Sequence, residues 1–210
     1  MLEVVTYVLG PVQTNTYLVC DSQTQEAVVI DPAWDGQSIL EDATRRGWHI
    51  CGLWITHAHF DHLAGAADIM ARLGDSLPVA LHPADLPLWQ VQGGAQLFGF
   101  RIESAPDPSV RLEHGQTLQI GSYKFEVRHT PGHTPGHVIF YCASERVVFC
   151  GDVIFNGSVG RTDLPGGSYN TLMESIQSQI LTLPDDTRLL SGHGPQTTVG
   201  IERQENPFLS

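Results

Sequence analysis

The stretch HAHFDHL, residues 57–63, holds three histidines and one aspartate within six positions. It follows the apolar run CGLWIT of residues 51–56, which predicts a buried strand that ends where the histidines begin. Neutral imidazoles and carboxylates are the ligands that borderline divalent metals prefer, so the stretch indicates a metal site. The alternative is a polar loop that happens to be rich in histidine, and it does not explain why matching residues recur elsewhere in the chain.

The polar residues of this stretch divide into two pairs. His57 and His59 are alternate residues of an extended segment, so both side chains point the same way and can bind one ion together. Asp61 and His62 stand where residues 62–73 are predicted to form a helix, so they point in a different direction. One stretch therefore offers half of each of two metal sites.

Three further stretches place a ligand type directly after a predicted strand and beside glycine, namely TPGH at 130–133, GD at 151–152 and SGH at 191–193. Strand ends that gather at one edge of a sandwich would bring these residues together, and glycine allows the backbone to approach closely. The predicted ligands are His57, His59 and His133 for a first ion, Asp61, His62 and His193 for a second, and Asp152 as a bridge between both.

This arrangement predicts hydrolytic chemistry, with Asp61 and Asp152 as the catalytic carboxylates. Two dications roughly 3.5–4 Å apart repel each other unless an anion lies between them, which is the role expected of Asp152. A water between the ions would lose a proton for the same reason, and the hydroxide would attack an acyl or phosphoryl centre. We expect two divalent ions, zinc first and iron or manganese as alternatives, because His/Asp sites accept all three.

Short β-branched runs dominate both halves of the sequence, with helical patterns inserted after them. The pattern predicts an α+β fold, a four-layer αββα sandwich of two mainly antiparallel sheets with helices outside, in a single domain of residues 1–210. Predicted strands lie at 4–9, 16–20, 27–31, 51–56, 79–82, 137–142, 146–150 and 187–191, with a hairpin at 117–127 around Gly121-Ser122. Predicted helices lie at 36–46, about 62–73 and 168–181, the last capped by Ser168 or Asn170, with a short helix near Ile201.

Composition excludes several classes of partner. The chain has 11 Lys and Arg against 23 Asp and Glu, a formal charge of −12, which argues against a nucleic acid or an anionic membrane. No apolar run approaches the roughly 20 residues that span a bilayer, and the N-terminus lacks a signal pattern, so we expect a cytoplasmic protein. The cysteines lack CxxC spacing and are predicted to be reduced core thiols: Cys20, Cys51, Cys142 and Cys150. The oligomeric state stays open.

Residues 83–108 form the least regular part of the sequence. Proline and glycine interrupt any period there, yet Trp89, Phe98 and Phe100 are too apolar for a free loop. We predict a covering segment near the site, with these three rings as candidates to line the pocket.

The ligand set, together with PVQTN at 11–15 and NPFL at 206–209, resembles the metallo-β-lactamase superfamily over essentially the whole chain. TPGHTPGH at 130–137 and GRTD at 160–163 resemble its glyoxalase II-like branch, the hydroxyacylglutathione hydrolases and their shorter relatives. The resemblance implies the αββα sandwich, a dinuclear site at its edge and hydrolysis of a small acyl thioester. Asp31 matches the aspartate of the first motif of the family, a supporting residue under the site, and an Asx turn before Pro32 is the alternative.

Two further residues are candidates for a supporting or substrate-binding role. His137 would brace the His133 loop as a hydrogen-bond donor, or be a satisfied buried histidine. Arg161 would hold a substrate carboxylate, although an ion pair with Asp163 is slightly favoured. The other histidines are predicted to be ordinary surface or core residues: His49, His82, His114 and His129.

Other activities of the superfamily are weighed against these features. Many true β-lactamases carry a cysteine at a second-ion position, where this chain has Asp152 and His62. RNA-processing relatives are longer and basic. Glyoxalase II proper carries an added C-terminal helical domain with glutathione contacts, and we expect a short form without it, which leaves the thiol carrier open. The alternatives are an iron-dependent persulfide dioxygenase, a metallo-hydrolase of another ester, lactone or phosphoester, and a non-catalytic member, although the last predicts missing ligands.

Overall fold

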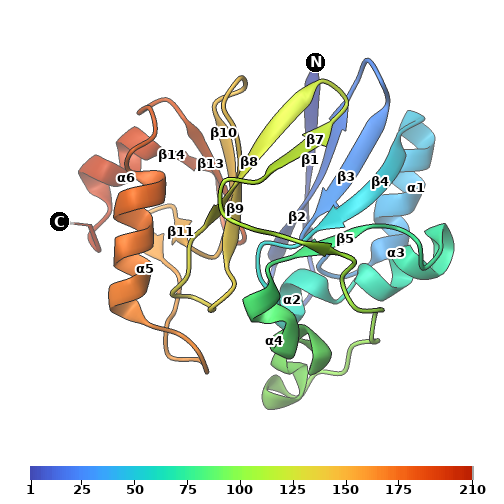
Figure 1. Ribbon diagram of the computed structural model, residues 1–210, viewed down its shortest axis with the longest axis horizontal. Helices are drawn as coiled ribbons and strands as arrows, with labels where there is room; N and C mark the ends of the chain where they lie inside the picture. The colour runs from blue at the N-terminus through green and yellow to red at the C-terminus, as the bar shows by residue number, and fades with distance from the viewer. Residues whose placement is uncertain (210) are drawn as a thin grey trace.

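The protein, described here as a computed structural model of residues 1–209, is a sandwich of two six-stranded sheets with helices on both outer faces (Figure 1). The first sheet has the order β1-β2-β3-β4-β5-β6 and the second β14-β13-β10-β9-β8-β7. The predicted αββα architecture is therefore confirmed.

The elements have the following bounds. The first sheet contains β1 (Leu2–Leu9), β2 (Thr14–Asp21), β3 (Glu26–Ile30), β4 (His49–Trp54), β5 (Val79–Leu81) and β6 (Val110–Arg111). The second contains β7 (Thr117–Ile120), β8 (Tyr123–His129), β9 (Val138–Cys142), β10 (Val147–Gly151), β13 (Arg188–Ser191) and β14 (Thr197–Thr198), and β11 (Ile154–Phe155) pairs with β12 (Ser158–Val159). The helices are α1 (Gly36–Arg46), α2 (Phe60–Leu63), α3 (Ala66–Leu73), α4 (Leu86–Gln90), α5 (Tyr169–Ser175) and α6 (Val199–Glu205), with the 3₁₀ segments η1 (Pro83–Asp85) and η2 (Gln92–Phe98) and the π-helical turn η3 (Ile176–Ile180).

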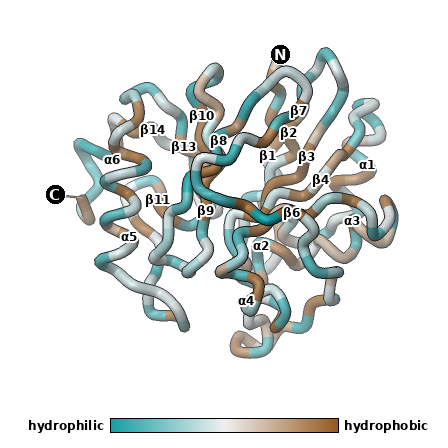
Figure 2. Tube along the Cα trace, in the orientation of Figure 1, coloured by the Kyte–Doolittle hydropathy of each residue, from teal (hydrophilic) through white to brown (hydrophobic). Residues whose placement is uncertain are grey.

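Three apolar layers hold the sandwich together. Tyr17 and Trp54 from the first sheet meet Phe125, Phe140 and Phe149 from the second, and these rings fill the space between the sheets. The outer layers lie under α1 and α3 on one side and under α5 and α6 on the other. Figure 2 shows the same division, since hydrophobic colour concentrates along the central strands and on the inward faces of the helices. Burial of these faces is the dominant favourable term for the fold.

The first sheet is more mixed than the sequence predicts. The pairs β1–β2 and β2–β3 are antiparallel as expected, but β3–β4, β4–β5 and β5–β6 are parallel. The cause is the insertion of α1 between β3 and β4, of α2 and α3 between β4 and β5, and of η1, α4 and η2 between β5 and β6, since a helical crossover returns the chain in the same direction. The second sheet is mainly antiparallel, with one parallel pair, β10–β13.

The helix predicted at 62–73 is two helices. It begins earlier, at Phe60, and divides at Ala64 and Gly65. The amide of Gly65 donates to the Pro32 carbonyl at 2.9 Å, and a Cβ at Gly65 would lie 3.3 Å from the Gly36 amide nitrogen. The break therefore lets α3 pack closely on the start of α1. In the second half, Ser168 is the cap, accepting from the Thr171 amide.

Three of the four cysteines are buried as predicted, but Cys51 is exposed, because the first half of β4 faces outward. All four are free thiols. In residues 1–209 there is no helix with the length and apolarity needed to cross a bilayer.

Candidate metal centre

The seven predicted ligands follow the ends of strands from both sheets. His57 and His59 come after β4, and α2 carries the next two, below the strand ends in Figure 1. His133 lies in the loop between β8 and β9, Asp152 directly follows β10, and His193 follows β13. Loops held at the edge of a rigid sandwich are a common setting for functional residues.

The structure brings three imidazoles together as the first predicted group. The Nδ1 atom of His59 lies 2.8 Å from Nε2 of His133, which lies 3.2 Å from Nε2 of His57. One nitrogen from each ring falls within a sphere suited to a single ion. Three nitrogen ligands with an open position are typical of catalytic zinc sites.

The second predicted group lies beside the first. Oδ2 of Asp61 is 3.4 Å from Nε2 of His62 and 3.2 Å from Nε2 of His193. Asp152 lies between the groups, because its Oδ2 is 3.6 Å from Nε2 of His133 and 3.4 Å from Nε2 of His193. This is the position that a bridging carboxylate requires.

Two buried polar atoms of the cluster make no hydrogen bond. They are Nε2 of His62 and Oδ1 of Asp152, which lie 3.4 Å apart. A buried donor or acceptor without a partner costs about 1–3 kcal/mol, so such atoms need an explanation. Nitrogen and carboxylate oxygen are zinc and iron ligands, and the donor set therefore fits two divalent ions.

Hydrogen bonds on the far side of the rings assign the tautomers. The Nδ1 atom of His133 donates to the Arg161 carbonyl at 2.8 Å, and Nδ1 of His62 donates to Oδ2 of Asp31 at 3.0 Å. With the proton on Nδ1, each neutral ring presents the lone pair of Nε2 to the cluster. Partners of this kind fix ring orientation and raise ligand basicity.

Asp31 organises the region beneath the centre. Its Oδ1 accepts from the Thr56 amide, and its Oδ2 accepts from the Thr56 hydroxyl as well as from His62, each within 3.0 Å. The Thr56 oxygen in turn accepts from Nδ1 of His57 at 3.1 Å. Asp31 has a left-handed backbone, with φ of 51°. One buried carboxylate thus orients a histidine of each group, as the family resemblance implies.

His137 contacts both the His133 loop and the backbone beside the cluster. Its Nδ1 bonds Thr130 in the His133 loop at 2.8 Å, but its Nε2 accepts from the backbone amide of Asp152 at 3.0 Å. The ring also stacks on His57, with centroids 5.0 Å apart. His137 therefore holds the backbone of Asp152 as well as the loop.

Asp85, a buried carboxylate at the start of α4, is a further residue of the site that could not be predicted from the sequence. It accepts from the Ala58 amide at 3.0 Å, the Thr134 hydroxyl at 2.7 Å and the Gly136 amide at 2.6 Å. It thereby ties the 57–63 loop to the His133 loop. Burial raises the pKa of Asp85. A single aspartate in an irregular segment carries no signal in the sequence.

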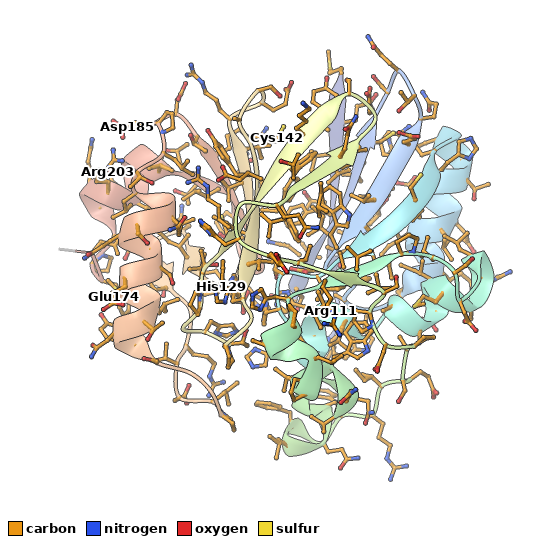
Figure 3. All side chains as sticks on the ribbon, in the orientation of Figure 1. Arg111, His129, Cys142, Glu174, Asp185 and Arg203 are labelled. Atoms are coloured by element: carbon orange, nitrogen blue, oxygen red, sulfur yellow. The ribbon has the colours of Figure 1, made fainter. Side chains whose placement is uncertain are left out.

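Arg161 forms the ion pair that was slightly favoured. Its Nε and Nη2 donate to Oδ1 and Oδ2 of Asp163 at 2.7 and 2.8 Å. His82 and His129 stack with centroids 4.1 Å apart, and His129 is labelled in Figure 3. Among the described residues, these two belong to no group of potential metal ligands.

The pKa values indicate where protons reside when no ion is bound. Burial lowers the pKa of His57 and His133. Burial also acts against protonation of His62 and His193, but the carboxylates beside them outweigh it, raising the pKa of His62 above its usual range and that of His193 to about 10. The neighbouring carboxylates therefore favour the protonated form of both rings when no ion is bound.

Metal binding is expected to release protons at neutral pH, because both rings must lose a proton to become ligands. Since the pKa of His193 is about 10, metal affinity should rise with pH from 7 towards 10. Titration calorimetry in two buffers of different ionisation enthalpy measures the protons released. Equal binding heats in the two buffers would contradict the assignment of His62 and His193 as ligands.

Gly192 allows the second group to assemble. A Cβ there would lie 2.1 Å from Oδ1 of Asp152 and 2.6 Å from Cε1 of His62. The Gly192→Ala variant is expected to weaken metal binding about 10–100-fold, the range for disturbing residues that position a ligand. Competition with a chromophoric chelator measures the loss. Gly200→Ala, in α6 with Asp185 as its nearest neighbour, is the matched control and should bind metal normally.

A cavity of about 270 Å³ opens beside the cluster. Phe98 and Phe100 line it, as expected for the 83–108 segment, whereas Trp89 is buried in the core under the first sheet. The lining residues are Val12, His59, Phe60, Asp61, Phe98, Phe100, His133, Asp152, Arg161, Leu164 and His193.

Comparisons with curated proteins identify relatives along nearly the whole chain. It is 39% identical to the probable metallo-hydrolase YqgX of Bacillus subtilis, covering 96% of this chain and 95% of the relative. It is 35% identical to the hydroxyacylglutathione hydrolase GloC of Haemophilus influenzae, covering 94% of this chain and 93% of that relative.

Solved structures give the same result. BLEG-1 B3 metallo-β-lactamase has a TM-score of 0.92 at 39% identity, covering 99% of this chain and all of that chain. TTHA1623 in a di-iron-bound form has a TM-score of 0.89 at 42% identity, covering 98% of this chain and 100% of that chain. ETHE1 from Myxococcus xanthus has 0.79 at 26%, covering 98% and 83%. The pattern of the metallo-beta-lactamase superfamily matches residues 9–193. The chain belongs to the metallo-β-lactamase superfamily.

Proposed function

We propose that the protein is a metallo-hydrolase that uses two divalent ions to cleave a small acyl thioester. Zinc is the first candidate for these ions, with iron and manganese as alternatives. The position of Asp152 between two groups of ligands carries the proposal, because a shared carboxylate is what two adjacent dications need. The similarity to the hydroxyacylglutathione hydrolase GloC supports the thioester. The ligands would be His57, His59 and His133 for one ion and Asp61, His62 and His193 for the other, with Asp152 shared.

Bound ions would activate a water and polarise the acyl carbonyl. The protein would hold the reacting groups in place and accept a proton. Asp61 lines the cavity and is the carboxylate that we propose for proton uptake. Its Oδ2 accepts from the Thr14 hydroxyl at 2.9 Å, which fixes the orientation of the carboxylate. The departing thiolate has a pKa of about 8.5, so it leaves without a strong general acid.

The test is a panel of thioesters that includes S-lactoylglutathione and an acyl ester of a neutral thiol, assayed with protein of known zinc, iron or manganese content. The turnover rate should rise in proportion to the fraction of protein that holds two ions. A β-lactam serves as the comparison substrate, because BLEG-1 is named as a β-lactamase. Failure to cleave any thioester with two ions bound would reject the proposal.

An iron-dependent persulfide dioxygenase is the second candidate. The three imidazoles of the first group could hold a single iron, and the similarity to ETHE1 fits this alternative. Oxygen uptake by iron-loaded protein with glutathione persulfide would favour it. Iron-loaded protein that cleaves thioesters and consumes no oxygen would remove it.

A further inference from the structure

One wall of the cavity beside the candidate metal centre is aromatic. The Phe60 ring stacks on Phe100 with centroids 5.3 Å apart and contacts Phe98 at 5.2 Å. Trp34 packs edge-on against Phe60 and Phe100 at 5.8 and 6.0 Å. Three of these rings, those of Phe60, Phe98 and Phe100, also line the cavity. We call these three the aromatic wall.

The aromatic wall is fixed to residues 57–63, the segment that carries four of the candidate ligands. Phe60 lies between His59 and Asp61 in the chain, so its ring is positioned with them. On the η2 side, a Cβ at Gly93 would lie 2.2 Å from the Phe60 amide nitrogen, so η2 packs directly on the loop backbone. The distance between the wall and the reacting centre is therefore set by the fold.

Apolar side chains continue from the wall to the cavity mouth. Val12 and Phe98 line the cavity and are 41% and 40% exposed, and Leu164 is a further apolar lining residue. Large apolar side chains exposed together at a pocket indicate a binding surface. The surface gains most from a ligand that covers it with hydrocarbon, at about 25 cal/mol for each Å² removed from water.

The charge of the cavity lining does not favour an anionic arm of the substrate. Arg161 is the one lysine or arginine among the lining residues. Its Nε and Nη2 both donate to the carboxylate of Asp163. A substrate carboxylate at this wall would therefore have to compete with Asp163 for the guanidinium. Outside the ligand cluster, the cavity walls therefore favour substrate groups that bury apolar surface over groups that carry a negative charge.

We propose that the aromatic wall, with Val12 at its rim, binds the acyl part of the thioester, so that the preferred substrates carry a hydrocarbon acyl group of several carbons or a phenyl ring. This inference rests on the proposed thioester hydrolysis and specifies its substrate class. A short hydroxyacyl group would leave the wall exposed to water and place a hydroxyl against Phe98 and Phe100.

The experiment uses thioesters of one neutral thiol, N-acetylcysteamine, with acetyl, lactoyl, butyryl, hexanoyl and phenylacetyl groups. With two ions bound, kcat/KM should rise roughly fourfold for each CH₂ that enters the pocket, and lactoyl should rank below butyryl. A flat series, or a preference for lactoyl, would overturn the inference while leaving thioester hydrolysis intact. Cleavage of S-lactoylglutathione but of no member of this series would overturn the inference alone, whereas failure to cleave either would reject the proposed function and the inference together.

A variant pair assigns the effect to the wall. Phe98→Ala is expected to lower the ratio of hexanoyl to acetyl kcat/KM about tenfold, the scale for losing hydrophobic discrimination. Leu97→Ala is the matched control, because Leu97 belongs to the same segment, is 74% exposed and does not line the cavity. Equal ratios for wild type and Phe98→Ala would overturn the role of the wall, and so would a loss of the ratio in Leu97→Ala.

Discussion

Replacement of Asp152 by alanine should remove at least one of two bound ions and lower thioester turnover by more than about 100-fold, the upper end for residues that only position a ligand. The carboxylate lies within 3.6 Å of one nitrogen from each group and is buried. Without it, the two ions would repel each other with no anion between them. Elemental analysis after gel filtration, combined with the thioester assay, measures both quantities.

The matched control is Asp186→Ala, an exposed aspartate that pairs with Arg146 at the protein surface. It should retain two ions and full turnover, which separates loss of the bridge from a general loss of negative charge. Unchanged stoichiometry and rate in the Asp152 variant would refute the assignment of the bridge.

The clustering of the candidate ligands could be predicted because most of them follow a strand and the chemistry of the residues is distinctive. His57 and His59 alternate in an extended segment, and Asp152 and His193 each stand beside a glycine at a strand end. The fold class followed from the same strands, since β-branched runs of a few residues with helices between them admit few arrangements.

The connections between these residues could not be predicted, because they join parts of the chain with no local relation. Asp85 bonds Ala58 and Gly136, which are 27 and 51 residues away. The parallel pairs of the first sheet depend on where each helix crosses, which short strands do not reveal. The aromatic wall likewise arises from tertiary packing of Phe98 and Phe100 on Phe60.

Asp31→Asn should weaken metal binding about 10–100-fold while the protein remains folded. The amide keeps the shape of the carboxylate but can offer only one oxygen, whereas Asp31 accepts from the Thr56 amide on Oδ1 and from His62 on Oδ2. With the amide oxygen toward the Thr56 amide, an NH₂ group faces Nδ1 of His62. The proton of His62 should then move to Nε2, the atom that faces the cluster, and the ring would no longer be a ligand. Nitrogen-15 chemical shifts of the ring in the metal-loaded protein report the tautomer, and a chelator competition reports the affinity.

Asp35→Asn is a matched control for this variant. Asp35 has a left-handed backbone with φ of 52°, nearly the value of Asp31, and its carboxylate caps α1 by accepting from the Ser38 amide. Both substitutions remove one negative charge at a left-handed aspartate, and asparagine adopts that conformation readily. A loss of metal affinity in Asp31→Asn but not in Asp35→Asn would therefore arise from the lost hydrogen bond to His62. Normal affinity in Asp31→Asn, with Nδ1 of His62 still protonated, would show that other contacts orient the ring. The tautomer and the affinity must change together if a buried carboxylate, itself no ligand, fixes which nitrogen of His62 can hold an ion.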